Sequence, residues 1–417
     1  MNSRERIKLA LEHRETDRVP VDLGGSPLTG MHVSSVYLLR KALGLKEEPV
    51  KVVEPYQMLG EIKQDMINRL GLDVVPLNGL VNMFGYKNEN WKEWEFSDGT
   101  PLLVPEKFIT EKNNEGILFS HPKGDTSVSP SARMPAGGYY FDAIIRQEEI
   151  DINNLKLEDN IEEFGLISDE ELDYYNEQAD YLHNTTDKAI LLPYGVASFG
   201  DIALVPGLHL KHPKGIRDVE LWYMASIMRP DFLKQIYEYQ CNIGIENLNK
   251  VYNSIGNKIS VIFLSGTDFG SQNGPLIDPK QYDSLYKPFH KRINDWVHKY
   301  TKWKTFIHSC GSVKAFYKNF SESGFDIFNP VQCSAADMHP KILKNEYGKE
   351  AVFWGAGIDT QKTLPFGTPS EIDNEVKERM EIFRKGGGFV FNSIHNIQAK
   401  IPIENLVALF EAIEKYR

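Results

Sequence analysis

Short apolar segments recur along the chain and are separated by amphipathic stretches of helical length. Eight of these segments favour β-structure, and most are apolar on both faces. Parallel strands buried between a core and covering helices show this pattern. The predicted strands are residues 19–23, 73–77, 189–194, 260–265, 304–308, 326–329, 351–355 and 388–393.

Between the later predicted strands lie amphipathic stretches that fit helices, at residues 279–300, 313–323 and 370–385. Alternation of strand and helix with short turns predicts βα units and a parallel sheet. Eight such units predict closure into a single (β/α)8 TIM barrel, and 417 residues suit such a barrel with insertions. We therefore expect one α/β domain that spans residues 1–417.

The N-terminal half departs from this rhythm. The segment WKEWEFSDGTPLLVP predicts a β-hairpin with Asp98-Gly99 as its turn, and an acidic segment of helical character follows, up to about residue 187. We interpret residues 88–187 as a β-hairpin and helical insertion that partly covers the barrel mouth, with surface decoration as the alternative. The chain ends in a predicted amphipathic helix with Pro402 at its start.

Composition narrows the classes of function. The net charge is −11 and no long basic run occurs, which argues against nucleic acid as the main partner. The sequence contains no run of 18 apolar residues, so no membrane span is predicted. The charged N-terminus lacks the features of a signal peptide. Three cysteines do not form a disulfide framework, so we expect free thiols or metal ligands in a cytoplasmic protein.

The sharpest chemical motif is FIHSCG, at the end of the fifth predicted strand. Side chains two apart on a strand point the same way, so His308 and Cys310 would converge on one point. Zn²⁺ accepts both imidazole nitrogen and thiolate, and a catalytic site needs a third protein ligand. His395 and Cys333 are the candidates for that ligand. Alternatively, His308 is a hydrogen-bonded core histidine and Cys310 a buried thiol.

Other polar residues follow predicted strands, where the active site of a barrel lies. Asp268 could orient a polar substrate or act as an acid or base, and it could equally cap a turn. Tyr194 offers a phenol at the end of the third strand. The residues expected to contact substrate are Gln272, Asn329, Gln332 and Asp359, although Asp359 could equally cap the next helix.

Several motifs together resemble uroporphyrinogen decarboxylase-like proteins. The resemblance covers nearly the whole chain except about residues 88–187. Its motifs are SRERIKLALEHRETDRVPVD, LGEIKQDMINRLGLDVV, FGDIALVPGL, DFGSQNGPLIDPKQYDSLYKPFHKRI, HSCGSV, NPVQCSAADM, GAGIDTQKTLPFGTP and GGGFVFNSIHNIQAKIPIENLVAL.

This superfamily contains tetrapyrrole decarboxylases and zinc methyltransferases that work with a corrinoid protein. The decarboxylases carry arginines after the first strand, where this chain has Asp22-Leu-Gly-Gly-Ser-Pro, and arginines supply most of the recognition of substrate carboxylates. His308-x-Cys310 matches the first two zinc ligands of the methyltransferases. His395 stands near the place of their last cysteine. Because the decarboxylases also have a histidine there, His395 is either the third zinc ligand or a residue that contacts substrate.

The resemblance implies a zinc-dependent methyltransferase that moves a methyl group between a small methylated substrate or thiol and a corrinoid protein. The chain would bind zinc itself, and the corrinoid would come with the partner, since no corrinoid-binding domain is recognisable. Asp268 or Tyr194 would protonate the leaving group. The runner-up is metal-free decarboxylation of a porphyrinogen, and a non-catalytic binding barrel is the third hypothesis. A homodimer is also compatible, because relatives often pair through the barrel surface.

Overall fold

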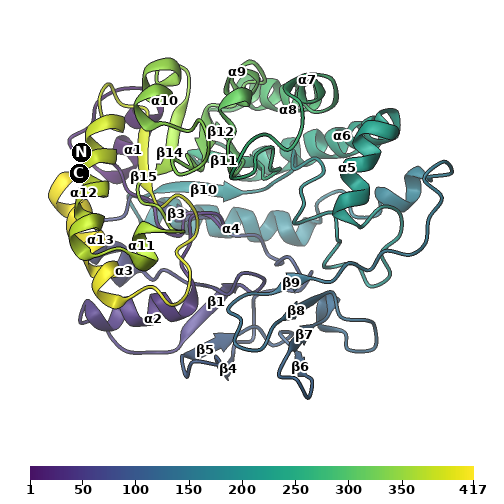
Figure 1. Cartoon of the computed structure of the whole chain (residues 1–417), viewed down its shortest axis with the longest axis horizontal. Helices are drawn as coiled ribbons and strands as arrows, with labels where there is room; N and C mark the ends of the chain where they lie inside the picture. Colours follow the sequence, from purple (N-terminus) through teal and green to yellow (C-terminus); the bar gives the residue numbers. More distant parts are fainter.

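The computed structural model describes residues 1–417 and centres on a curled parallel sheet (Figure 1). The sheet has seven strands in the order β15-β14-β13-β12-β11-β10-β3, and every neighbouring pair is parallel. This α/β architecture is consistent with the predicted TIM-like barrel. The strands are β3 (Val74–Pro76), β10 (Ala189–Pro193), β11 (Val261–Ser265), β12 (Lys304–His308), β13 (Ile327–Asn329), β14 (Val352–Ala356) and β15 (Phe389–Asn392).

The first predicted strand, residues 19–23, forms a single parallel bridge, between Val21 and Phe391. It nevertheless bonds to both edges of the sheet. The Asp22 N–H donates to the Phe391 carbonyl at 2.9 Å, and the Asp73 N–H donates to the Val21 carbonyl at 2.8 Å. The segment therefore lies between β15 and the start of β3. Pro20 has no N–H to offer a ladder, which explains why no longer strand forms.

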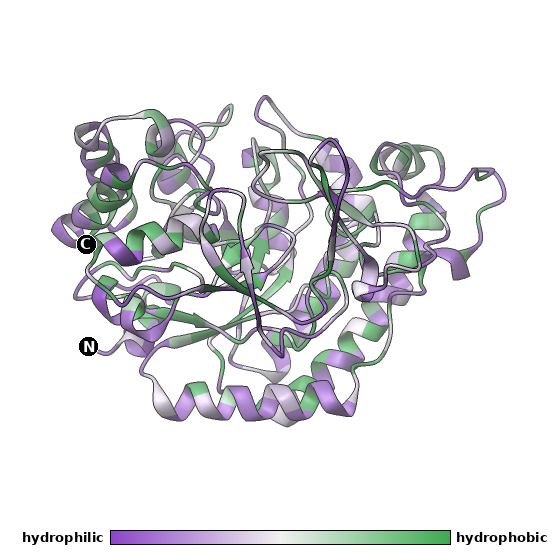
Figure 2. Cartoon of the chain, turned by 90° about the horizontal axis from the view of Figure 1, so that it is seen from below, coloured by the Kyte–Doolittle hydropathy of each residue, from purple (hydrophilic) through white to green (hydrophobic).

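Helices surround the curled sheet, and in Figure 2 the central strands are largely hydrophobic while the outer helices carry both polar and apolar residues. The predicted helix 279–300 is interrupted at Tyr286, and a second helix starts with Pro288 in its first turn. No helix is long and apolar enough to span a bilayer. The helices are α1 (Ser3–Leu11), α2 (Val33–Ala42), α3 (Gln64–Leu70), α4 (Asp169–Thr185), α5 (Val219–Met228), α6 (Pro230–Ile255), α7 (Pro279–Leu285), α8 (Lys287–Tyr300), α9 (Tyr317–Glu322), α10 (Pro340–Tyr347), α11 (Thr363–Phe366), α12 (Pro369–Phe383) and α13 (Ile403–Tyr416).

The hydrophobic core has two parts. The smaller cluster joins side chains of all seven strands, such as Phe306 and Trp354, to Ile7 and Leu11 of α1. The larger cluster of 85 residues fills the space between the sheet and the surrounding elements. Helix α1 thus packs its apolar side chains against the residues enclosed by the curled sheet.

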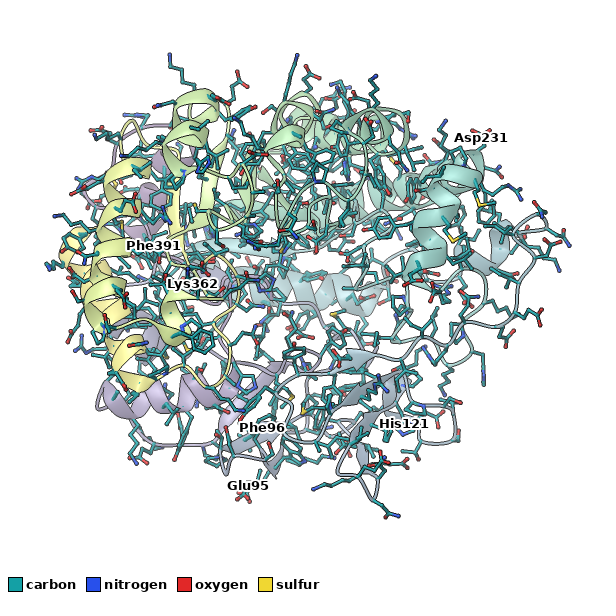
Figure 3. All side chains as sticks on the ribbon, viewed as in Figure 1. Glu95, Phe96, His121, Asp231, Lys362 and Phe391 are labelled. Carbon is teal, nitrogen blue, oxygen red and sulfur yellow. The ribbon has the colours of Figure 1, made fainter.

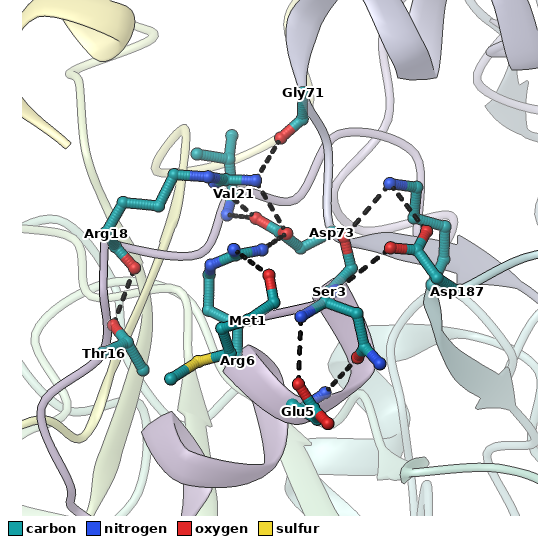
Figure 4. A network of polar contacts seen from close by, with 12 residues as sticks. Met1, Ser3, Glu5, Arg6, Thr16, Arg18, Val21, Gly71, Asp73 and Asp187 are labelled. Atoms are coloured by element: carbon teal, nitrogen blue, oxygen red, sulfur yellow. Dashed lines mark hydrogen bonds and ion pairs between the residues drawn. The ribbon is translucent and has the colours of Figure 1, made fainter.

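Asp73, just before β3, is fully buried and holds α1, the 19–23 segment and β3 together (Figure 4). Its carboxylate accepts hydrogen bonds from Arg6 at 2.7 Å, from Arg18 at 2.8 Å and from the Val21 N–H at 2.9 Å. A buried charge needs such partners to offset the loss of water. Because Asp73 precedes β3, this network stabilises the amino ends of the strands, opposite the carboxyl ends where a site is expected.

Two small sheets lie beside the barrel-like sheet. The predicted hairpin is confirmed: β4 (Lys92–Glu95) and β5 (Pro101–Val104) pair antiparallel, and Gly99 takes the left-handed φ of 85° that its turn requires. Figure 3 labels Glu95, an exposed strand residue, and Phe96, which is buried. The second sheet contains β6 (Thr110–Lys112), β7 (Leu118–Ser120), β8 (Ala132–Met134) and β9 (Asp142–Ala143).

The sheet with the hairpin also contains β1 (Val50–Glu54) and β2 (Leu59–Gly60), which precede residue 88. Helix α4 lies between β3 and β10 in sequence and packs against α6 and β10. The acidic helical segment therefore contributes a helix to the set around the main sheet. The bounds 88–187 of the expected insertion stay a prediction.

Candidate metal centre

A cavity of about 820 Å³ lies at the carboxyl ends of the strands. Residues 139–142, next to β9, line it from the side of the small sheets. Five of the residues singled out in the sequence line this one cavity, and they come from four different places along the main sheet. They are Tyr194 after β10, Asp268 after β11, His308 and Cys310 at the end of β12, and His395 after β15.

Three of these side chains offer metal-ligand atoms that lie within 4.8 Å of one another: His308, Cys310 and His395. The Cys310 Sγ and the His308 Nε2 are 3.2 Å apart. A tetrahedral zinc ion with ordinary Zn–S and Zn–N bonds would hold such atoms about 3.5 Å apart. The donor set therefore fits Zn²⁺, and the Cys310–His308 distance is close to the value that the ion requires.

The His308 ring is fixed by a hydrogen bond on its far side. Its Nδ1 lies 2.6 Å from the Asn329 Oδ1, and the Asn329 Nδ2 donates to the Trp354 carbonyl at 2.8 Å. Because the amide nitrogen is held by that carbonyl, its oxygen faces His308 and accepts the Nδ1 proton. The Nε2 lone pair is thereby left free on the side of Cys310. This is the arrangement that orients zinc-binding histidines in proteins.

His395 supplies the third donor, with its ring centroid 5.4 Å from that of His308. Its imidazole has no hydrogen-bond partner in the protein. Burial lowers the pKa of His308 to about 4, and burial together with the neighbouring His308 lowers the pKa of His395 to about 4. Both rings are therefore neutral at pH 7, which is the state that binds a metal.

The two candidate cysteines have different surroundings. Burial, and secondly Asp268, raise the pKa of the Cys310 thiol well above its ordinary value, so only a metal cation would make it a thiolate at neutral pH. Cys333 lies outside the donor cluster and does not line the cavity. Its Sγ contacts the Val331 carbonyl at 3.4 Å. Of the two candidates for the third donor, the structure thus groups His395 with His308 and Cys310.

Asp268 and Tyr194 lie beside the donor cluster. The Asp268 Oδ1 accepts the Cys310 backbone N–H at 2.7 Å, which ties the loop after β11 to the loop after β12. Burial raises the pKa of Asp268, and burial also raises the pKa of Tyr194. Both groups are therefore biased toward their protonated forms, which a proton donor in a site requires.

Asp201 is a cavity residue that the sequence reasoning missed. It is only 9% exposed, its Oδ1 accepts the Ala203 N–H at 2.9 Å, and burial raises its pKa to about 7. The available signal was its place in FGDIALVPGL, a motif that carries the family resemblance. The local pattern alone gave no reason to separate it from a turn aspartate.

The four residues expected to contact substrate lie outside the cavity lining. Asn329 lies behind His308, and Gln332 accepts the Gly311 N–H at 2.8 Å and donates to Gln272 at 2.7 Å. Asp359 accepts backbone N–H groups at the start of its own loop, and with Gln272 it lines a neighbouring groove. Their contact with substrate stays a prediction. In this structure Gln332 supports the loop that carries Cys310.

The charged residues that line the cavity are all acidic. Its lining contains three aspartates, Asp142, Asp201 and Asp268, and neither lysine nor arginine. Aromatic rings from several segments complete the wall: Tyr56, Tyr139, Tyr140, Phe141, Tyr194 and Phe263.

A curled parallel sheet with a cavity and polar side chains at the carboxyl ends of its strands is the arrangement found in α/β-barrel enzymes. Residues 209–416, about half of the chain, match the family model described as Uroporphyrinogen decarboxylase (URO-D). The chain belongs to the uroporphyrinogen decarboxylase superfamily, as its motifs predict.

A solved structure of a methyltransferase from Methanosarcina mazei is similar over 100% of this chain and 99% of its own, with a TM-score of 0.56 and 17% sequence identity. At this identity the likeness shows a shared fold. No curated protein matches the chain significantly.

Proposed function

We propose that this protein is a zinc-dependent methyltransferase that moves a methyl group between a small methylated substrate or thiol and a corrinoid protein. The observation that carries the proposal is the cluster of His308, Cys310 and His395 at the cavity wall, with its donor atoms within 4.8 Å. Asn329 adds support, because it fixes the tautomer of His308 in the form that a metal needs. The methyltransferase name of the structural neighbour agrees with the proposal.

Zinc, when bound by these three residues, would hold a substrate thiol as thiolate or act as a Lewis acid on an ether or amine-type methyl donor. Three protein ligands leave one position of a tetrahedral site for substrate. Asp268 and Tyr194 line the same cavity, where either could protonate a leaving group. The corrinoid protein would dock at the cavity mouth.

Decarboxylation of a porphyrinogen is the alternative reaction of the superfamily. A substrate with many carboxylates requires cations for recognition. The cavity offers three aspartates and neither lysine nor arginine, so it is electrostatically unfavourable for such a substrate. This charge distribution favours methyl transfer over decarboxylation. The homodimer and the cytoplasmic location stay predictions.

The proposal is tested with free methylcobalamin as a corrinoid surrogate and 2-mercaptoethanol as the thiol. The zinc-loaded protein is expected to accelerate loss of the methyl–cobalt absorbance. Removal of the metal by a chelator should abolish the acceleration, and added Zn²⁺ should restore it. Undiminished activity after chelation, or release of CO₂ from uroporphyrinogen by the metal-free protein, would contradict the proposal.

A further inference from the structure

The charge and shape of the cavity point to the chemical class of its small ligand. We infer that the cavity binds a methylated ammonium cation, a quaternary or protonated tertiary amine. This inference rests on the proposed function and specifies its small methylated substrate. The ammonium nitrogen has no lone pair for zinc, so its methyl group would pass directly to the nucleophilic acceptor, the C–N bonding pair would stay on nitrogen, and the neutral amine would leave without a proton from Asp268 or Tyr194. It is carried by a buried carboxylate without a counter-ion, set beside aromatic rings in a cavity that lacks lysine and arginine.

Asp201 is the carboxylate at the centre of this inference. It is nine-tenths buried, and its hydrogen bond from Ala203 engages the Oδ1 atom. The Oδ2 atom of Asp201 has no hydrogen-bond partner in the protein, and Asp201 is one of the residues of the cavity wall. Buried carboxylates are normally paired with a cation or fully hydrogen-bonded. A cationic ligand would supply the missing partner.

An aromatic ring lies next to that oxygen. A Cβ atom placed on Gly266 would lie 2.7 Å from the Asp201 Oδ2 and 3.2 Å from the Cζ of Phe263, so the carboxylate and the ring flank one point of the wall. Because residue 266 is a glycine, no side chain occupies this point. Carboxylates combined with aromatic rings recognise quaternary ammonium ions, since the face of an aromatic ring attracts a cation and the methyl groups pack against the ring.

A bound zinc ion would not make the wall beside Asp201 cationic. Zn²⁺ with one thiolate from Cys310 would carry a net charge of about +1. The ionised form of Asp201 offsets this charge, whereas Asp268 is biased toward its neutral form and Asp142 is exposed to solvent. A cation bound against Asp201 favours the ionised form of this carboxylate, so a cation is favoured there over a neutral molecule of the same shape.

The test compares choline with its uncharged carbon isostere, 3,3-dimethyl-1-butanol, by titration calorimetry on the zinc-loaded protein. Choline is expected to bind roughly 30-fold more tightly, the magnitude of a desolvated cation–π contact. Asp201→Asn should reduce that preference about tenfold or more. Asp142→Asn is the matched control: it removes an exposed carboxylate of the same cavity and should change the preference less than about threefold, because solvent screens its charge. Zinc content and the melting temperature verify that each variant is folded.

The inference would be overturned if the two compounds bind equally or if neither binds. It would also be overturned if the neutral methyl ether anisole binds more tightly than choline. If zinc content and thiol methylation persist in that case, the proposed function stands and only the substrate class is wrong. Conversely, a protein that prefers choline but binds no zinc would contradict the proposed function while retaining the ligand class. A preference for choline that Asp201→Asn leaves intact would also overturn the role of this carboxylate.

Discussion

Substitution of Asn329 by alanine tests whether His308 is held as a metal ligand. The change removes the 2.6 Å contact between the Asn329 Oδ1 and the His308 Nδ1, in a place where the two residues are 3% and 4% exposed. The imidazole would then lose its fixed tautomer and leave a buried Nδ1–H group unpaired. Loss of such an outer partner lowers zinc affinity about 10- to 100-fold, or about 1.4–2.7 kcal/mol.

Zinc affinity is measured by competition with a coloured chelator, and stability by thermal unfolding of the metal-free protein. Asn294→Ala is the matched control, because Asn294 is equally buried and its Nδ2 donates to the Ser323 carbonyl at 2.7 Å, away from the cavity. Both variants are expected to lose about 1–3 kcal/mol of stability. Only Asn329→Ala should lose zinc affinity, whereas Asn329→Asp, which keeps an acceptor, should retain it. Wild-type zinc affinity in Asn329→Ala would refute the reasoning.

Three further outcomes follow from the structure. Asp73→Ala leaves two arginines without their shared carboxylate, so it should lower the free energy of unfolding by about 3–5 kcal/mol. Urea titrations measure this loss, and a loss below about 1 kcal/mol would contradict the role of this network. Burial raises the pKa of Glu54 from 4.5 to about 7, so the folded state holds its proton more tightly than the unfolded state. The contribution of Glu54 to stability is therefore complete below about pH 4.5 and is lost as the pH rises to about 7. Glu54→Gln should flatten the curve of stability against pH between these values, and an unchanged curve would contradict this role of Glu54. Gly266→Ala places a Cβ 2.7 Å from the Asp201 Oδ2 and should weaken choline binding at least tenfold without loss of zinc, as measured by calorimetry and metal analysis.

The strands of the main sheet could be predicted from sequence because they are apolar on both faces, as parallel strands are. The first strand was overestimated, since Pro20 limits residues 19–23 to a bridge. The strand β1 was missed because its nearby partner β2 has only two residues, and its other partner, β5, lies far along the chain, with Val50 paired to Leu102. Contacts over such separations leave no local pattern.

The donor pair was predictable because His308, the last residue of β12, and Cys310 are two residues apart at the end of this strand. The hydrogen bond between Asn329 and His308 could not be predicted, since it depends on the register of β12 against β13. In this register His308 is paired with Asn329. Periodicity indicates that a strand exists but leaves its register open. Asp201 was missed for a related reason, because its burial beside Gly266 arises from the packing of one loop over another strand end.

The most direct test is the metal content of the purified protein after loading with Zn²⁺ and desalting. Wild-type protein is expected to hold about one zinc ion per chain, Cys310→Ser to lose it, and Cys333→Ser, the cysteine outside the cluster, to keep it. A protein without zinc, or zinc that survives Cys310→Ser but is lost in Cys333→Ser, would contradict a centre formed by His308, Cys310 and His395.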